Sequence, residues 1–290
     1  EMIKQSLVTG KTNVYGIVGF PVSHSLSPVM QNAALADAGV DGIYVPFSVS
    51  PEQLSAAVSG LRALHVRGFN VTIPHKAAIM PLLDELAPSA LDAGAVNTVH
   101  NSNGCLIGHN TDGDGLLAAI RQELDYRVAG ANVIVIGAGG AARGALAALC
   151  AAGVRSVTVI NRTRAAAEML IGMFQSKFPK TGFQAIGFAG DLSRCLPETD
   201  LLINASSLGM AGEKIAGVSL ALLPCHARVY DMVYAPASTP LLEEARQRGL
   251  KASNGLSMLV AQGERAFEIW HGRPPRSGMM RAALQTVYSG

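Results

Sequence analysis

The stretch NVIVIGAGGAARGALAALCAAGVRSVTVINRTR, residues 132–164, decides the fold. It predicts a buried strand over 132–137, a tight glycine turn, a helix of small residues over 141–152 and a second strand over 156–161. Glycines in such a turn let a pyrophosphate approach the N-terminus of the following helix. Because strand, turn, helix and strand follow in the required order, the segment is interpreted as a dinucleotide-binding βαβ unit.

The glycine turn itself follows a G-x-G-x-x-G/A pattern. Gly137 and Gly139 supply the turn and the close approach, and Ala142 takes the third position, where a small residue lets helix and strand pack. The alternative interpretation is an ordinary turn in which glycine only closes a helix end. The intact unit around the turn favours the nucleotide site.

The second strand ends in Asn161, Arg162, Thr163 and Arg164, where a fold selective for NAD carries Asp or Glu. An acid there would accept hydrogen bonds from the ribose hydroxyls and repel a 2′-phosphate. Guanidinium groups match phosphate geometry instead, and Thr163 adds a hydroxyl donor. The alternative is a solvated basic helix start, although cations at a helix N-terminus oppose the helix dipole unless an anion binds. The segment therefore predicts a site for NADP.

Composition limits the classes of function. A chain of 290 residues that is 49% apolar and 15% charged is typical of a folded two-domain α/β enzyme rather than a disordered protein. A net charge of +2 without a polybasic tract argues against nucleic acid or a membrane surface as a partner. The longest run of small apolar residues, 145–154, is too short to cross a bilayer.

The four cysteines are widely spaced and form no CxxC motif, so neither a metal site nor a disulfide framework is expected. The N-terminus lacks the apolar segment of a secretion signal, and a cytoplasmic protein is expected.

Strand patterns alternate with helical ones along most of the chain, which favours an α/β fold with parallel sheets. The further predicted strands are 14–19, 42–47, 67–72, 200–206 and 228–234, and further helices are expected over 51–65 and 163–174.

Polar residues at strand ends before residue 112 predict the ligand contacts of the other half. In GFPVSHSLSP (19–28), Pro28 suggests the first turn of a helix with Ser27 at its cap. Ser25 and the free helix N–H groups could then receive an anion such as a carboxylate. Helix capping without a ligand is the alternative.

Two further stretches place charged residues at strand or helix ends. NVTIPHK (70–76) runs from a strand through a proline turn to Lys76, which could also be a solvated surface charge. His75 beside it is interpreted as a polar surface group. In GAVNTVHNSNGCLIGHNTDGDG (94–115), two Asn-Thr pairs bracket a predicted hairpin, and Asp112 opens a helix, where it could serve only as its cap.

Together these stretches resemble the shikimate dehydrogenases, including their quinate/shikimate relatives. The resemblance follows the family's order over nearly the whole chain. Its segments are HSLSP, NVTIPHK, GAVNT, NTDG, GAGGAA, NRTR, NASSLGM (204–210), DMVYAPASTPLL (231–242) and NGLSMLVAQGERAFEIW (254–270). It implies a Rossmann-type NADP-binding domain over 113–254 and a discontinuous α/β substrate-binding domain over 1–112, onto which C-terminal helices in 255–290 pack back.

The resemblance also implies the activity and its residues. The expected reaction is the NADPH-dependent reduction of 3-dehydroshikimate to shikimate in chorismate and aromatic amino acid biosynthesis, by a monomer or homodimer. Lys76 and Asp112 match the catalytic pair. Substrate contacts are implied for Ser25, Ser27, Thr72, Asn97, Asp112, Tyr234 and Gln262. Cofactor contacts are implied for Gly137, Ala138, Gly139, Gly140, Ala141, for Asn161, Arg162, Thr163, Arg164 and the two residues after them, and for Met232 and Gly255.

The chemistry of the pair can be argued from the residues. Hydride delivery to a ketone leaves negative charge on the oxygen, so a nearby group must supply a proton. The Lys76 ammonium can do this at neutral pH; which of Lys76 and Asp112 carries the proton stays open.

Two departures from the family pattern leave the alternatives open. Ser206 stands where the family more often has Thr, and Ser257 stands in GLSM where it usually has GLGM. A quinate/shikimate dehydrogenase with relaxed substrate or cofactor choice is therefore the second hypothesis. A nucleotide sensor without turnover is the third, against which the retention of Lys76 and Asp112 argues.

Overall fold

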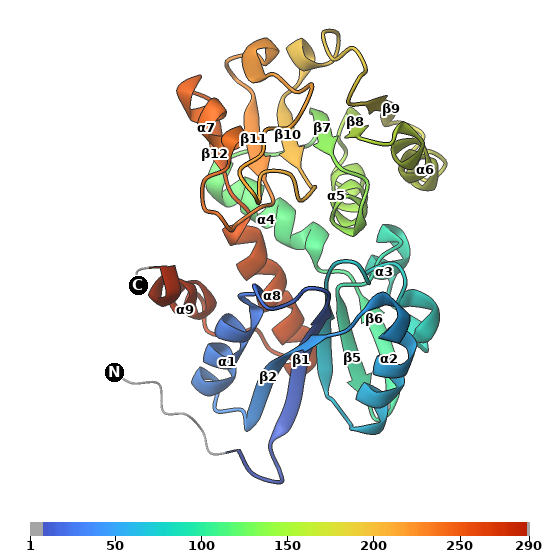
Figure 1. The fold of residues 1–290 in the computed structure, drawn as a ribbon, viewed down its shortest axis with the longest axis vertical. Helices are drawn as coiled ribbons and strands as arrows, with labels where there is room; N and C mark the ends of the chain where they lie inside the picture. The colour runs from blue at the N-terminus through green and yellow to red at the C-terminus, as the bar shows by residue number, and fades with distance from the viewer. Residues whose placement is uncertain (1–7, 289–290) are drawn as a thin grey trace. The chain divides into compact units, whose positions relative to one another are not determined.

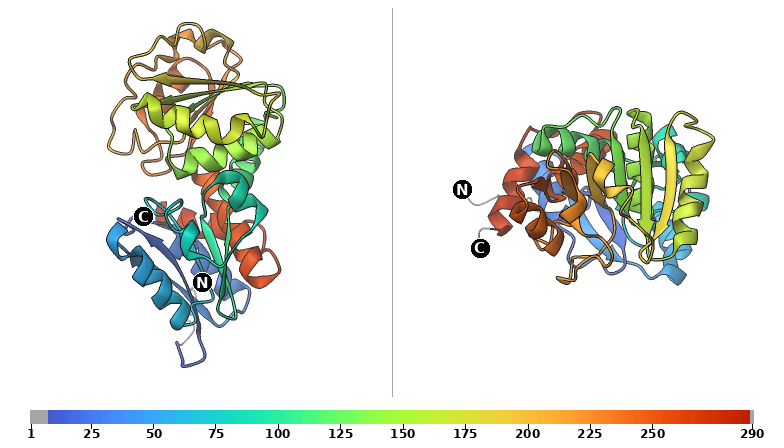
Figure 2. Two further views of the ribbon diagram at one scale, coloured as in Figure 1. Left: turned by 90° about the vertical axis from the view of Figure 1, so that its right-hand side faces the viewer. Right: turned by 90° about the horizontal axis from the view of Figure 1, so that it is seen from above.

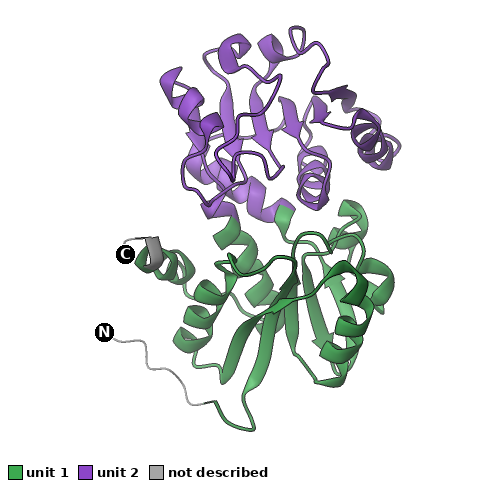
Figure 3. Ribbon diagram, viewed as in Figure 1, with its two compact units in different colours: residues 1–112, 259–290 green, residues 113–258 purple. Residues whose placement is uncertain are grey.

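The computed structural model describes residues 8–288, and the chain divides into two compact units. The first unit comprises residues 1–112 and 259–290, and the second comprises residues 113–258 (Figure 3). The first division falls at Asp112, as in the predicted domains, whereas the second falls after Met258 rather than after residue 254. Met258 belongs to the second unit because its side chain is buried in that unit's core.

The first unit contains a six-stranded mixed sheet with the order β2-β1-β3-β5-β6-β4. Its strands are β1 (Asn13–Gly19), β2 (Gly42–Ser48), β3 (Gly68–Val71), β4 (Glu85–Leu86), β5 (Thr98–Ser102) and β6 (Cys105–His109). The strand β1 pairs in parallel with β2 and β3, while β5 runs antiparallel to both β3 and β6. The predicted hairpin is thus confirmed, but the expectation of parallel sheets is wrong here, because the hairpin's first strand joins the sheet beside β3.

Helices cover both faces of this sheet. They are α1 (Ser27–Asp37), α2 (Leu54–Ala63), α3 (Pro88–Ala93), α8 (Leu256–His271) and α9 (Met279–Tyr288), with short 3-10 turns at Pro51–Gln53 and Met80–Leu82. Val58 and Leu61 of α2 pack with Phe69 of β3 in the core of one face. On the other face the Trp270 ring of α8 lies 5.5 Å from the Tyr15 ring, centroid to centroid. The helices on both faces fix the positions of the strands, and the candidate site residues lie at the ends of these strands.

The second unit contains a six-stranded parallel sheet, and its strand order β12-β11-β10-β7-β8-β9 can be followed across Figure 1. The strands are β7 (Asn132–Ile136), β8 (Ser156–Asn161), β9 (Gly182–Gly187), β10 (Leu201–Asn204), β11 (Arg228–Asp231) and β12 (Lys251–Ser253). This is the order of a Rossmann fold, in which β7 pairs with both β8 and β10. The strand order reverses between β7 and β10, and a dinucleotide is expected to bind at such a switch point.

The sheet of the second unit is buried on both faces. One face packs against α4 (Asp112–Leu124), α5 (Gly140–Ala151) and α6 (Arg164–Gln175) through residues such as Val133 and Val135. Figure 2 shows α5 and α6 along this face in its left view. The other face packs against α7 (Pro240–Gln247) and the 3-10 turns at Leu196–Glu198 and Leu220–Leu222 through Ile134 and Ile136.

Burial of alternate residues on opposite faces explains why these strands are apolar throughout. The two-domain α/β class with a Rossmann-type domain is confirmed. None of the helices in residues 8–288 is both long and apolar enough to cross a membrane.

Candidate active site and dinucleotide site

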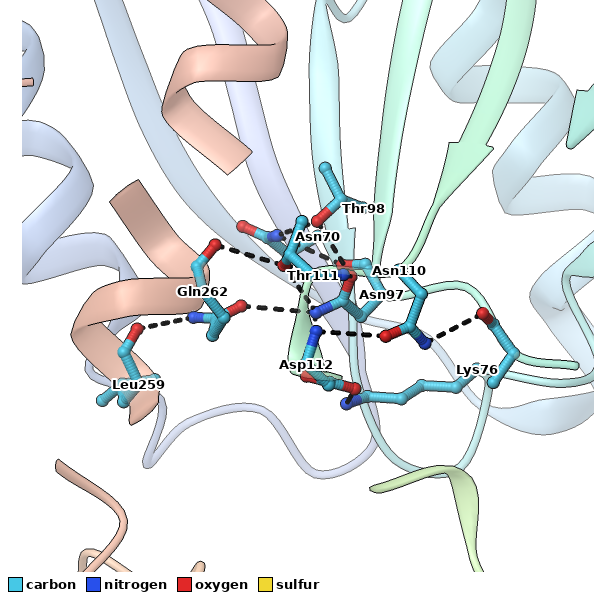
Figure 4. Close-up of polar contacts among 10 residues, drawn as sticks. Asn70, Lys76, Asn97, Thr98, Asn110, Thr111, Asp112, Leu259 and Gln262 are labelled. Atoms are coloured by element: carbon cyan, nitrogen blue, oxygen red, sulfur yellow. Dashed lines mark hydrogen bonds and ion pairs between the residues drawn. The ribbon is translucent and has the colours of Figure 1, made fainter. Parts of the chain in front are cut away.

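The two predicted catalytic residues form an ion pair in the first unit. Lys76 lies on the loop after β3, and Asp112 is the first residue of α4. The Lys76 Nζ atom lies 2.5 Å from the Asp112 Oδ2 atom, and the two side chains are only 13% and 6% exposed (Figure 4). A pair so withdrawn from water keeps a defined geometry, because breaking it would leave a buried charge without a partner.

Asn97 fixes the carboxylate from the other side. Its Nδ2 atom donates to Asp112 Oδ1 at 2.8 Å and to Thr111 Oγ1 at 2.9 Å. Its Oδ1 atom accepts from the Thr111 backbone N–H at 2.8 Å, so the amide orientation is set by its partners. Gln262 of α8 brings its Oε1 atom to 3.5 Å from the same Asn97 Nδ2, and its Nε2 donates to the Leu259 carbonyl. Four predicted residues therefore form one polar cluster: Lys76, Asn97, Asp112 and Gln262.

Sequence reasoning missed Asn70 as a member of this cluster. Its Nδ2 atom donates to Thr98 Oγ1 at 3.0 Å and to the Asn97 carbonyl at 3.1 Å, and its Oδ1 accepts from the Tyr44 hydroxyl at 2.7 Å. Burial raises the pKa of Tyr44 well above its ordinary value, so its hydroxyl stays a donor. The available signal was the strand period of two, which places Asn70 on the same side of β3 as Thr72.

His75 is buried rather than at the surface. It is 1% exposed, and its Nε2 atom lies 2.7 Å from the Val49 carbonyl oxygen. Its backbone N–H donates to the Thr72 carbonyl, which closes the turn that precedes Lys76. The interpretation as a polar surface group is therefore wrong, and the ring instead helps to anchor the loop that carries Lys76.

The predicted substrate residues Ser25, Ser27 and Thr72 follow neighbouring strands. β1 and β3 pair in parallel, and the loops after them meet where the Phe20 N–H donates to the Ile73 carbonyl at 2.9 Å. The prediction of Ser27 as the cap of α1 is wrong, since the helix begins at Ser27 itself and the cap residue is Leu26. The Ser25 hydroxyl accepts from the Ser27 N–H at 3.3 Å, and no side chain caps the helix.

The glycine turn in the second unit fits a pyrophosphate. Gly137 has a φ of 108°, in the left-handed region, and a Cβ there would lie 3.1 Å from the Ala205 carbonyl oxygen. Gly139 caps α5, and a Cβ at Gly139 would meet nothing within 4 Å, so its outer side is open. The first N–H groups of the helix lack intrahelical partners and suit an anion. Ala142 is fully buried, as the packing position requires.

The two arginines follow β8, the strand next to β7. Arg162 is exposed and makes no hydrogen bond or ion pair with residues 8–288, and Arg164 is exposed with its Nε 2.8 Å from Glu168 Oε1. Asn161 turns back to donate to the Thr163 carbonyl, and Thr163 caps α6 without a side-chain bond. An exposed ion pair contributes little to stability, so both cations remain available to a phosphate.

The two residues predicted to lie near the nicotinamide, Met232 on the loop after β11 and Gly255 on the loop after β12, also lie in the second unit. Gly255 packs so closely that a Cβ would lie 2.1 Å from the Met232 carbonyl oxygen, and its N–H donates to the Val233 carbonyl. Tyr234 follows on the loop after β11 and therefore belongs to the second unit, unlike the other predicted substrate residues. Ser257, one of the two departures, is buried and donates to the Glu123 carboxylate of α4.

A fully buried carboxylate holds the loop after β11 in place. Asp231 accepts from Asn204 Nδ2 at 2.9 Å, from the Val233 N–H at 3.0 Å and from the Thr239 hydroxyl at 2.6 Å. Burial raises the pKa of Asp231 above its ordinary value despite these three donors. The Asp231 carboxylate therefore links the end of β10 to the loop after β11.

Asp231→Asn is expected to change how stability depends on pH. Because the folded-state pKa is raised, the contribution of Asp231 to stability is full below the unfolded pKa near 3.8 and is lost as pH rises through the folded value. The asparagine does not titrate. The stability advantage of the wild type over the variant should therefore be larger at pH 4 than at pH 7, measured by urea unfolding at both. A gap that is constant, or that widens toward pH 7, would contradict the raised pKa.

Within residues 8–288, no group of three or more His, Cys, Asp or Glu side chains is arranged to hold a metal ion. The polar cluster of the first unit and the glycine turn of the second are therefore the two candidate sites. The first offers an ammonium, a carboxylate and amide groups, which suit a polar ring with hydroxyls. The second offers a helix N-terminus and two cations, which suit a phosphorylated dinucleotide.

Comparison with known proteins shows which family the chain resembles. Family models of the shikimate dehydrogenase substrate binding domain, of shikimate / quinate 5-dehydrogenase and of the shikimate 5'-dehydrogenase C-terminal domain match residues 17–99, 118–211 and 255–285. A shikimate dehydrogenase (NADP(+)) of Geobacter sulfurreducens is 51% identical over 280 residues, which are 96% of this chain and 98% of that protein.

Solved structures resemble the whole chain. A shikimate dehydrogenase in complex with NADP+ has a TM-score of 0.88 at 40% identity and covers 97% of each chain. The Thermus thermophilus shikimate 5-dehydrogenase in complex with NADP(H) and shikimate has a TM-score of 0.83 at 36% identity, covering 94% of this chain and 99% of that one. With such identity along nearly its full length, the chain belongs to the shikimate dehydrogenase family.

Proposed function

We propose that this chain catalyses the NADPH-dependent reduction of 3-dehydroshikimate to shikimate, a step of chorismate and aromatic amino acid biosynthesis. The observation that carries the proposal is the nearly buried pair of Lys76 and Asp112 within a cluster of amide groups. Relatives at 51% and 52% identity are named shikimate dehydrogenase (NADP(+)), which supports both the substrate and the cofactor.

The first unit binds the substrate and moves the proton. NADPH supplies the hydride that the carbonyl carbon receives, and the carbonyl oxygen then needs a proton. The Lys76 ammonium donates it. Asp112 keeps the amine in position through the 2.5 Å contact, and Asn97 in turn fixes the Asp112 carboxylate through a 2.8 Å bond. Asn97, Asp112 and Gln262 hold the ring hydroxyls.

The substrate carboxylate and the remaining contacts are assigned to strand ends. Ser25 and Ser27 hold the carboxylate at the start of α1, where hydroxyl and N–H donors lie together. Thr72 and Tyr234 complete the contacts to the ring. These roles are carried over from the family to matching positions of this chain.

The second unit binds the cofactor. The turn from Gly137 to Ala141 holds the pyrophosphate at the N-terminus of α5, and the segment from Asn161 to Arg164 holds the adenosine end with its 2′-phosphate. Met232, after β11, and Gly255, after β12, are assigned to the nicotinamide. We further propose a cytoplasmic enzyme, monomeric or homodimeric; its four free cysteines suit a reducing compartment.

The test is a set of four initial-rate assays, with shikimate or quinate as substrate and NADP+ or NAD+ as cofactor. Shikimate with NADP+ should give a kcat/KM at least about tenfold above each other combination, because quinate adds a hydroxyl that the pocket must accommodate. Comparable values with quinate and NAD+ would instead identify a relaxed quinate/shikimate dehydrogenase. Tight NADPH binding without oxidation of either acid would indicate a nucleotide sensor.

A further inference from the structure

Asn110 lies in the short connection between β6 and α4, two residues before Asp112. It is buried, and its side-chain oxygen accepts from the Asp112 backbone N–H at 3.0 Å. Its Nδ2 atom donates to the Ala95 carbonyl at 2.9 Å, and its own N–H donates to Ser89 Oγ at 3.1 Å. Asn110 thus ties the backbone of Asp112 to the segment before β5.

The same segment holds the backbone of Lys76. The Val96 N–H donates to the Lys76 carbonyl at 2.7 Å, and both Ala95 and Val96 are fully buried. A closed ring therefore runs from Lys76 through Val96 and Ala95 to Asn110, then to Asp112, and returns through the ion pair. Figure 4 shows Asn110 bonded to Asp112, and Asp112 paired with Lys76.

The ring fixes the two backbones that set the ion-pair geometry. A lysine side chain has four rotatable bonds, so its amine is placed well only when its backbone and its partner are both fixed. Without Asn110 the buried Asp112 N–H would lose its acceptor, and the start of α4 would shift to find another. A shift of about 1 Å in a catalytic group can lower the rate by about 10²-fold.

We propose that Asn110 is a positioning residue for the reaction and acts through the Lys76–Asp112 pair rather than by touching substrate. This inference rests on the proposed function, in which Lys76 donates the proton. Both ends of the Asn110 side chain are bonded to backbone groups, the oxygen to the Asp112 N–H and the nitrogen to the Ala95 carbonyl, so neither end is left to hold substrate.

The chain contains a matched control. Asn101 is likewise buried in the same sheet; its Nδ2 donates to the Val66 carbonyl at 3.0 Å and its Oδ1 accepts from the Gly104 N–H at 2.7 Å. It makes the same two kinds of bond as Asn110, but at the turn between β5 and β6. Asn101→Ala therefore reproduces the loss of packing and hydrogen bonds without disturbing the ring.

The experiment compares Asn110→Ala and Asn101→Ala in the full chain, each with and without Lys76→Ala. Both should lower the urea midpoint to a similar extent. Asn110→Ala should lower kcat about tenfold, whereas Asn101→Ala should leave it within about twofold. In the Lys76→Ala background Asn110→Ala should have no further effect on kcat, because no ammonium remains to be positioned.

Other results overturn the inference in distinguishable ways. A further tenfold loss in the Lys76→Ala background would mean that Asn110 acts independently of Lys76. Equal kcat for the Asn110→Ala and Asn101→Ala variants would reduce Asn110 to a structural role while leaving the proposed function intact. Near-normal turnover of Lys76→Ala alone would remove the proton donor and with it both proposals.

A conservative variant keeps the test available if Asn110→Ala does not fold. Asn110→Ser retains an oxygen that can accept from the N–H two residues on, but it cannot reach Ala95. Its kcat should lie between the wild type and the alanine variant, and the dependence on Lys76 should be the same. A serine variant with full loss of kcat at normal stability would contradict the role given to the Asp112 bond.

Discussion

Replacing Lys76 by alanine is expected to lower kcat by about 10²- to 10⁴-fold, because the reaction loses the group that protonates the carbonyl oxygen. The expectation rests on geometry: the amine lies 2.5 Å from Asp112 Oδ2 and is largely withdrawn from water, so bulk solvent cannot easily replace it. NADPH should still bind, since the predicted cofactor residues lie in the second unit. Steady-state kinetics at saturating 3-dehydroshikimate and NADPH measure the loss, and NADPH fluorescence measures binding.

Two further variants separate proton transfer from simple hydrogen bonding. Lys76→Gln keeps a donor that can reach toward Asp112 but has no ammonium to give up a proton, so its kcat should fall as far as that of the alanine variant. Lys251→Ala, at an exposed position of β12, removes the same charge and should leave kcat unchanged. If the glutamine variant retained wild-type kcat, Lys76 would only orient the carbonyl and another group would supply the proton.

The dinucleotide half was predicted well because its signals are local. The glycine turn, the helix after it and the end of β8 lie within 132–164, and each depends on neighbours a few residues away. The open side of Gly139 and the burial of Ala142 follow directly from the pattern. The predicted strands and helices of this half agree with the structure apart from shifts at their ends, whereas no range was predicted for β9, β12, α4 or α7.

The substrate half was predicted through its motifs, but its contacts could not be read from them. Asn70 reaches Tyr44 of β2 and Thr98 of β5, and these three strands come together only through the order of the sheet. The Asn110 bond to Ala95 depends in the same way on the hairpin that separates them. Hydrogen-bond partners of this kind cannot be predicted from residue type, because they lie far apart along the chain.

Local propensity also misplaced two residues. Ser27 looked like a helix cap because it stands directly before Pro28, yet the helix begins at Ser27 and the Ser27 N–H donates to the Ser25 hydroxyl. His75 was interpreted as exposed because a lone histidine on a loop is more often a polar surface group, yet the Val49 carbonyl provides a buried partner for its ring. The His75 contact depends on tertiary packing, whereas the Ser27 case is a shift of one residue in where the helix begins.

The double substitution Arg162→Ala and Arg164→Ala is expected to raise the dissociation constant for NADPH by about 10²-fold while changing that for NADH by about threefold or less. Hydrogen bonds to charged groups contribute about 1.5–3 kcal/mol each, and about 1.4 kcal/mol corresponds to a factor of ten in affinity. NADH lacks the 2′-phosphate, so it has little to lose at this position. Fluorescence titration with both nucleotides measures the two changes.

The two arginines should not contribute equally. Arg162 has no partner among residues 8–288, whereas Arg164 must leave its exposed pair with Glu168 before it can bind a phosphate. Such a pair is worth about 0–1 kcal/mol, so Glu168→Gln should tighten NADPH binding by no more than about fivefold. The Arg162→Ala variant alone should accordingly lose more affinity than the Arg164→Ala variant.

A control of equal charge tests whether the effect is local. Arg246→Ala with Arg248→Ala removes two cations from the end of α7 in the same unit and should leave NADPH affinity nearly unchanged. Raising the salt concentration should weaken NADPH binding to the wild type more than to the Arg162→Ala, Arg164→Ala variant, because exposed charges are screened. Equal losses for NADPH and NADH would contradict the phosphate site and would mean that the arginines serve the fold at the start of α6 rather than the 2′-phosphate.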